Sequence, residues 1–206
     1  MHADVVSPFL ALKEAAREEG FDLRILSGFR DFRRQSSIWN RKCRGELAVL
    51  DSAAVPLDIA TLGEKELVYA ILRWSALPGA SRHHWGTELD VWDENARPEG
   101  YDIDLVPEEV EAGGMFAPLH EWLDHRMAEG AAFGFYRPYA QDLGGVAPER
   151  WHLSHAPTAA HFEAVLSPEV VRDAVVGADL ALKDVVLEHL DDIYRRFVVN
   201  VNRRPS

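Results

Sequence analysis

The sequence has little cysteine and no long hydrophobic run. Cys43 is the single cysteine among 206 residues, which excludes an internal disulfide. Its basic helical surroundings offer the thiol no partner for nucleophilic chemistry. No apolar run approaches the roughly 18–20 residues of a membrane-spanning helix, so no membrane span is expected. Residues 1–4 lack a cationic region followed by an apolar core, and no signal peptide is recognised there.

Basic residues are also few. The chain has 22 Lys and Arg against 34 Asp and Glu, which gives a formal net charge of −12. A protein that binds nucleic acid needs a basic field to attract phosphates, so we expect no nucleic-acid partner. The composition, 47 % hydrophobic and 27 % charged, is typical of a globular protein. The length suits one domain, and the sequence leaves the oligomeric state open.

The order of helical and strand patterns predicts an α+β fold. A small antiparallel sheet carries the functional site, helices flank it, and a helical C-terminal extension follows. Expected strands are residues 21–26, 87–92, 132–136, 151–154 and 197–201. Expected helices start at Ser7-Pro8, at Asp31, at a capping box of residues 61–64, near residue 116, at Ser167-Pro168 and near residue 180. Residues 1–155 would form a catalytic core, and residues 156–206 would pack on it within one domain.

Residues 81–90, which read Ser-Arg-His-His-Trp-Gly-Thr-Glu-Leu-Asp, gather residue types that bind metals. A hydrolytic zinc ion needs three protein ligands and an open position, and His nitrogen and Asp oxygen are suitable ligands. His83 and Asp90 supply two of them. Gly86 takes a turn conformation that most residues avoid. In the strand that follows, Asp90 shares a face with Glu88 and Trp92, so its carboxylate projects back toward His83.

The third ligand must come from another segment. We choose His152, because Glu149 lies three residues before it and a zinc peptidase needs a general base beside the metal. A spacing of three puts side chains on opposite faces of a regular strand, so Glu149 should lie in a bent segment. His84 and His155 are the rival ligands. His84 points away from His83 in an extended segment, and His155 lacks a glutamate three residues earlier.

Four motifs in order resemble the D-alanyl-D-alanine metallopeptidases of the VanY type, a zinc peptidase family. Their pattern is Ser-x-His-x-x-Gly-x-Ala-x-Asp followed by Glu-x-Trp-His, which residues 81–90 and 149–152 match except at Glu88. Residues 27–30, Ser-Gly-Phe-Arg, are similar to the family's Ser-Gly-Tyr-Arg segment. Residues 134–139 are similar to the segment before the last motif. The resemblance covers about residues 21–155.

This resemblance implies roles for individual residues. His83, Asp90 and His152 would bind zinc, Glu149 would act as general base and then acid, and Arg30 would stabilise the oxyanion or orient the substrate. Further substrate contacts are expected from Ser81, Gln35, Glu88 and Trp151. Alternatives stay open for three of them. Ser81 could instead cap a turn, and Gln35 could make a structural hydrogen bond. Glu88, where the family commonly has alanine, could instead be a partner of a metal ligand.

The resemblance also implies a substrate, a cell-wall stem peptide that ends in D-alanyl-D-alanine and loses its last residue. Related enzymes cut the same peptide between L-alanine and D-glutamate, and the motifs do not separate the two activities. A zinc-bearing binding module without turnover, as in hedgehog signalling domains, is a third possibility. Such a substrate indicates the periplasm or cell envelope. Without a signal peptide, either an export signal was removed or the protein acts on cytoplasmic precursors.

Overall fold

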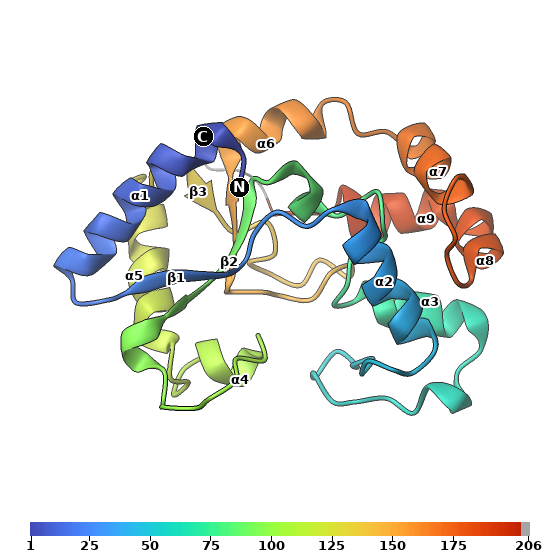
Figure 1. Cartoon of the computed structure of the whole chain (residues 1–206), viewed down its shortest axis with the longest axis horizontal. Helices are drawn as coiled ribbons and strands as arrows, with labels where there is room; N and C mark the ends of the chain where they lie inside the picture. The colour runs from blue at the N-terminus through green and yellow to red at the C-terminus, as the bar shows by residue number, and fades with distance from the viewer. Residues whose placement is uncertain (203–206) are drawn as a thin grey trace.

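A small antiparallel sheet lies at the centre of residues 1–202, the part of the chain that the computed structural model describes (Figure 1). Within these residues it has four strands in the order β1-β2-β4-β3, and each neighbouring pair is antiparallel. The strands are β1 (Leu23–Ser27), β2 (Glu88–Asp93), β3 (Phe135–Tyr136) and β4 (His152–His155). The predicted α+β class and antiparallel sheet are confirmed.

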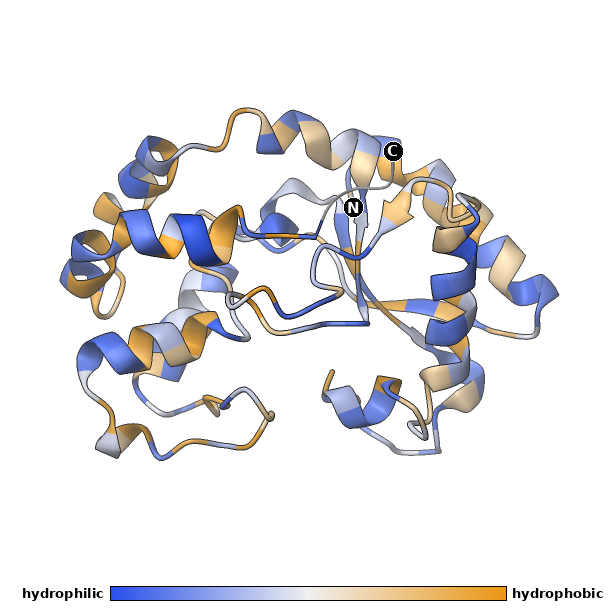
Figure 2. Cartoon of the chain, turned by 180° about the vertical axis from the view of Figure 1, so that it is seen from behind, coloured by the Kyte–Doolittle hydropathy of each residue, from blue (hydrophilic) through white to orange (hydrophobic). Residues whose placement is uncertain are grey.

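Helices surround the sheet on both sides (Figure 1). They are α1 (Ala3–Glu18), α2 (Phe32–Cys43), α3 (Glu64–Leu72), α4 (Pro107–Val110), α5 (Ala117–Ala128), α6 (Ala156–Glu163), α7 (Pro168–Val176), α8 (Lys183–Glu188) and α9 (Leu190–Ile193). Polar and apolar residues interleave along these helices, as expected of helices with one buried face (Figure 2). No helix among residues 1–202 is long and apolar enough to cross a membrane.

One hydrophobic core lies between the sheet and helices α1 and α5. Alternation along β2 sends Leu89 and Val91 into this core, where both are fully buried. They pack with Leu12 of α1 and Leu119 of α5. The intervening positions of β2, including Asp90, therefore lie on the opposite face of the sheet.

A second hydrophobic core joins α2 and α3 to the C-terminal helices. Trp39 of α2 is fully buried among side chains of α3, α7, α8 and α9. Its indole nitrogen donates a hydrogen bond of 3.0 Å to the carbonyl of Ala181. The C-terminal segment therefore packs against helix α2, the element that follows Arg30. That it forms one domain with the rest stays a prediction.

Two predicted helix starts are wrong. Helix α1 begins at Ala3 rather than at Ser7, with His2 as the N-cap, and Pro8 lies inside it. The additional turn buries Val5 completely against the sheet core, which outweighs the capping preference of Ser7. Helix α3 has Gly63 as its N-cap, two residues later than the predicted N-cap Thr61. The Glu66 carboxylate accepts the Gly63 N–H at 2.9 Å. The caps predicted at Asp31 and Ser167 are confirmed.

The C-terminal segment also differs from the sequence pattern. The single helix predicted from residue 180 is broken into α8 and α9, with Leu182 in the left-handed conformation before α8 and a non-helical residue at His189. The strand predicted for residues 197–201 is absent from the described residues, because Tyr194–Val198 form a π-helical turn that buries Phe197. Helix α6 has no counterpart among the predictions.

Candidate metal centre and active site

The register of the sheet brings two of the predicted ligands together. Asp90 of β2 and His152 of β4 are directly opposite each other, on the face away from the α1 and α5 core. Side chains at such positions contact each other across neighbouring strands. His152 Nδ1 accordingly lies 3.0 Å from Asp90 Oδ1. Both side chains are almost completely buried.

The third predicted ligand arrives from a turn. His83 lies in the short 3₁₀ helix Arg82–Trp85, which Gly86 ends with a φ of 70°. A Cβ at Gly86 would lie 2.8 Å from the backbone nitrogen of His2, so this left-handed turn requires glycine. His83 Nδ1 lies 2.8 Å from the Gly28 carbonyl, to which it donates. His83 Nε2 is therefore left for Asp90, whose Oδ2 lies 3.4 Å away.

The three groups form a compact donor set. One ligand atom each from His83, Asp90 and His152 lies within 4.8 Å of the other two. Donors about 2.1 Å from a tetrahedral metal ion lie about 3.4 Å apart. The pairs at 3.0 Å and 3.4 Å agree with that spacing. Two imidazoles and one carboxylate are also a usual donor set for catalytic zinc. The side chains therefore fit a zinc ion with an open fourth position.

Charges around His152 favour a cation. Burial opposes a charge on its imidazole, but Asp90 and Glu88 on its two nitrogens raise the pKa of His152 to about 10. Burial likewise opposes the charge on Asp90, yet His83 and His152 hold the pKa of that carboxyl well below its ordinary range. Asp90 is therefore ionised at neutral pH, and the surroundings stabilise positive charge where the metal would bind.

Glu149 stands beside the donor set. Residues 149–152 form the expected bend, in which the His152 N–H donates to the Glu149 carbonyl at 3.1 Å. Glu149 Oε2 lies 3.6 Å from His152 Nδ1, and the side chain is only 12 % exposed. Burial raises the pKa of Glu149 to about 7, and Asp90 adds to this effect. A carboxyl group with this pKa can both accept and release a proton near neutral pH.

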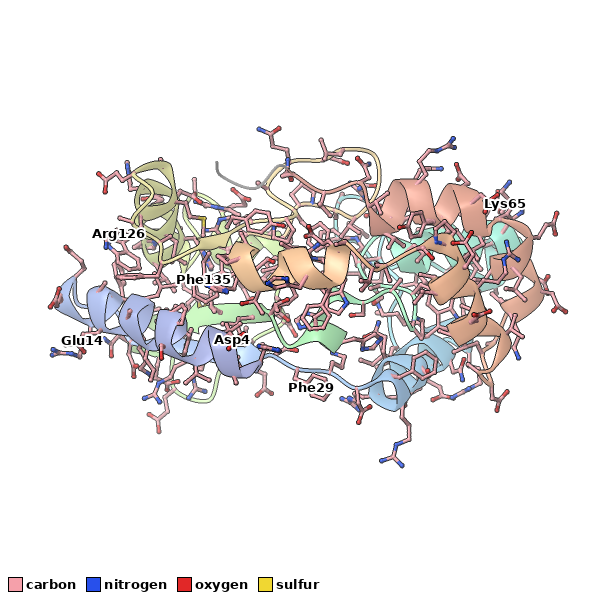
Figure 3. All side chains as sticks on the ribbon, turned by 90° about the horizontal axis from the view of Figure 1, so that it is seen from above. Asp4, Glu14, Phe29, Lys65, Arg126 and Phe135 are labelled. Atoms are coloured by element: carbon pink, nitrogen blue, oxygen red, sulfur yellow. The ribbon has the colours of Figure 1, made fainter. Side chains whose placement is uncertain are left out.

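Arg30 reaches the same place from the end of β1. Its guanidinium donates to Ser27 Oγ at 2.8 Å and to Gln35 Oε1 at 3.0 Å, and it lies 4.0 Å from Asp90. The neighbouring Phe29, labelled in Figure 3, is 59 % exposed, whereas Arg30 turns inward. His84 holds the backbone here, because its Nδ1 lies 2.6 Å from the Arg30 carbonyl.

A cavity of about 220 Å³ opens above these groups. Arg30, Glu149 and the three candidate ligands line it. Trp151 and Trp74 form a wall, with their rings stacked at 6.4 Å. Ser81 also lines the cavity and makes no side-chain cap to the 3₁₀ helix. The lining therefore combines charged groups with apolar aromatic rings.

The structure places four predicted or rival residues outside this cavity. Gln35 is fully buried and uses its amide to hold Arg30 and the Ala76 carbonyl, so its predicted contact with substrate does not fit. Glu88 is also fully buried, behind His152, and its predicted substrate contact is a contact with that histidine instead. His84 binds backbone groups through both ring nitrogens. His155 contacts Thr158, away from the donor set.

Other residues of the cavity were missed from the sequence. Tyr139 lies over His152 with ring centroids 5.1 Å apart, and its carbonyl accepts the Glu149 N–H at 2.9 Å. Its place in the segment before the last motif was the available signal. Asp104 and Leu105 also line the cavity, from a loop that carries no motif.

Comparison with known proteins assigns this architecture to a family. The sequence model of the VanY family, described as D-alanyl-D-alanine carboxypeptidase, matches residues 1–158. The chain belongs to the VanY family. It is 35% identical over 125 residues to an uncharacterized protein of Haemophilus influenzae, an alignment that spans 60% of this chain and 93% of that protein. It is 27% identical over 155 residues to a D-alanyl-D-alanine carboxypeptidase of Enterococcus faecalis, covering 73% of this chain and 46% of that protein.

Solved structures of VanY enzymes share the fold. A zinc complex of a vancomycin-resistance D,D-pentapeptidase VanY mutant superimposes with a TM-score of 0.51 at 19% identity, over 90% of this chain and 83% of the other. A VanYB complex with D-alanine-D-alanine gives a TM-score of 0.52 at 19% identity, over 89% and 81% of the two chains. Family membership supports a peptidase of the peptidoglycan carboxypeptidase type.

Proposed function

We propose that this protein is a zinc-dependent D-alanyl-D-alanine carboxypeptidase that removes the terminal D-alanine from peptidoglycan stem peptides or their precursors. The observation that carries the proposal is the convergence of His83, Asp90 and His152 within 4.8 Å, with Glu149 and Arg30 beside them on one cavity. The zinc and the D-alanine-D-alanine bound to VanY structures support the metal and the substrate class.

The residues have distinct tasks in this proposal. Zinc, held by His83, Asp90 and His152, supplies Lewis-acid activation of a water molecule and of the scissile carbonyl. Glu149 accepts a proton from the attacking water and delivers it to the nitrogen of the leaving D-alanine. Its burial in the cavity wall matches both steps, because the raised pKa makes the carboxyl a base and an acid near neutral pH.

Arg30 stabilises the negative charge that develops on the carbonyl oxygen. Ser27 and Gln35 hold its guanidinium in place before substrate arrives, so little reorganisation is needed during the reaction. Asp90, 4.0 Å away, also keeps this cation close to the metal position. Arg30 is 24 % exposed, which leaves its outer face open to the cavity and to substrate.

The size of the cavity suits a small terminal residue. About 220 Å³ is less than the roughly 300–1,000 Å³ of pockets for drug-sized ligands. The end of a chain with methyl side chains fits such a space, and Trp74 and Trp151 provide an apolar wall for a methyl group. The carboxypeptidase is proposed over the endopeptidase because of the family match and the D-alanine-D-alanine bound to a VanYB structure.

The test is mass spectrometry of a muramyl pentapeptide after incubation with zinc-loaded protein. The proposal predicts loss of one terminal alanine and no other fragment. Fragments cut after L-alanine would identify the endopeptidase and reject the carboxypeptidase. An untouched peptide, with zinc bound, would favour a binding module without turnover.

A further inference from the structure

Glu88 is fully buried in the middle of strand β2, directly behind a candidate metal ligand. Its Oε2 lies 3.0 Å from His152 Nε2, the ring nitrogen on the far side from Asp90. His152 thus has a carboxylate on each nitrogen. Nδ1 lies 3.0 Å from Asp90 Oδ1, and Asp90 Oδ2 lies 3.4 Å from His83 Nε2, so Nδ1 is the nitrogen on the side of the other two ligands.

The other oxygen of Glu88 is fixed by hydrogen-bond donors. Ser154 Oγ and Thr87 Oγ1 donate to Oε1 at 2.8 Å and 3.0 Å. Arg82 Nη2 lies 3.2 Å from the same oxygen, and this arginine is only 3 % exposed. These contacts leave Oε2 for His152 alone. The Arg82 guanidinium and the two hydroxyl donors around Oε1 together favour the ionised form of Glu88.

Each ring nitrogen of His152 lies 3.0 Å from a carboxylate oxygen, and a metal ion held with Asp90 would take the place of a proton on the Nδ1 side only. An ionised carboxylate can only accept a hydrogen bond, so the proton in the contact of 3.0 Å sits on His152 Nε2. An imidazole that binds a metal ion is neutral and carries one ring proton, so with that proton on Nε2 the lone pair would be on Nδ1. We propose that Glu88 is a positioning residue that holds His152 in the tautomer and ring orientation in which Nδ1 binds the metal. This inference rests on the zinc centre of the proposed function.

Arg82 stabilises the buried Glu88 carboxylate. A buried carboxylate without a partner is costly, and Arg82 supplies the compensating charge. Arg82 is itself held by Glu163 at 2.8 Å, by Tyr136 and by stacking on Trp85 at 4.7 Å. An alanine in place of Glu88 would offer no acceptor for the Nε2 proton.

The first experiment measures zinc affinity by competition with a chelator for the wild type, Glu88→Ala, Glu88→Gln and a control, Asp93→Asn. Removing a group that orients a metal ligand costs about 10–100-fold in affinity, so Glu88→Ala should bind zinc that much more weakly and Glu88→Gln less so. Asp93 is another buried carboxylate on the same strand, and it accepts the backbone N–H groups of Asp22 and Asn95. Its variant should lose stability and keep the wild-type zinc affinity.

Thermal unfolding of the metal-free variants shows whether each variant is folded, so that a loss of zinc affinity can be distinguished from a loss of folding. Folded Glu88 variants that bind zinc as tightly as the wild type would overturn the inference while leaving the zinc centre intact. A wild type that binds no zinc would instead refute the proposed function. If Glu88→Ala does not fold, nitrogen NMR of the zinc-loaded wild type decides. The His152 proton should be on Nε2, and a proton on Nδ1 would overturn the inference.

Discussion

Replacing Glu149 with glutamine isolates the proposed general base. Glutamine has the same shape, so the bend of residues 149–152 and the packing around it should persist. The side chain cannot accept a proton from water at neutral pH. Glu149 is not among the three donors within 4.8 Å, so the variant should keep its zinc. Turnover should therefore fall without loss of metal.

The magnitude follows from the position of the carboxylate. Glu149 is the buried carboxyl beside the donor set with a pKa raised to about 7, the value that suits proton transfer near neutral pH. General acid–base catalysis contributes about 10²–10⁴-fold to rate, equivalent to about 3–5 kcal/mol of transition-state stabilisation. Because Glu149 would serve as base and then acid, we expect a loss toward the upper end of that range.

The assay is single-turnover release of alanine from the pentapeptide, with zinc content measured on the same sample. Asp93→Asn serves as the control, since it removes a buried carboxylate from β2 outside the cavity. If the turnover rate of Glu149→Gln is within tenfold of the wild-type rate, Glu149 is not the general base. A variant without zinc would show instead that Glu149 helps to hold the metal.

Three further predictions concern stability and reactivity. In metal-free protein, burial raises the pKa of Glu149 from an ordinary 4.5 to about 7, so the folded state retains a proton that the unfolded state loses. The free energy of unfolding of the wild type should therefore fall relative to that of Glu149→Gln as pH rises from 4.5 to 7. Denaturant unfolding of both proteins at pH 4.5 and 7.5 checks this, and the same difference in free energy at both pH values would contradict it. Burial raises the pKa of Cys43 to about 11, so alkylation at pH 8 should be about a hundredfold slower than in denaturant; equal rates would contradict the burial. Ile193 is fully buried against α2 and α3, so Ile193→Ala should lower the free energy of unfolding by about 2–5 kcal/mol in one transition; two separate transitions would divide the chain into two domains.

The candidate centre was predictable where its geometry depends on local spacing. The period of two along β2 placed Asp90 on the polar face, and the turn glycine Gly86 brought His83 back toward it. The bend at Glu149 followed from its spacing to His152. Each of these features lies within a few residues of its cause, so the sequence alone contains the information.

Burial and partners of the remaining polar residues depend on long-range packing. Glu88 shares a face of β2 with Asp90, and Gln35 follows Arg30 in the next helix. Both are held by partners distant in sequence, the Ala76 carbonyl for Gln35 and the Ser154 hydroxyl for Glu88. Periodicity gives the face of a residue and does not show what covers it. Tyr139 and Leu105 line the cavity for the same reason, because their loops fold toward it.

The C-terminal segment shows the same limit. Its apolar stripe was predicted and does pack in the second core, through Val186, Leu190 and Ile193. The break at His189 and the π-helical turn after Ile193 have no local signal such as proline or glycine. They arise because Phe197 and Val198 are buried against the same core. Tertiary packing therefore overrides the helical and strand preferences of residues 180–201.

Turnover measured against zinc equivalents tests the central claim most directly. Metal-free protein would be titrated with zinc while release of terminal alanine from the pentapeptide is recorded. The account predicts no turnover without metal and a rise to a plateau at about one zinc ion per chain, as expected for one site with three ligands. Full turnover in the metal-free protein, or saturation with zinc without any release of alanine, would contradict it.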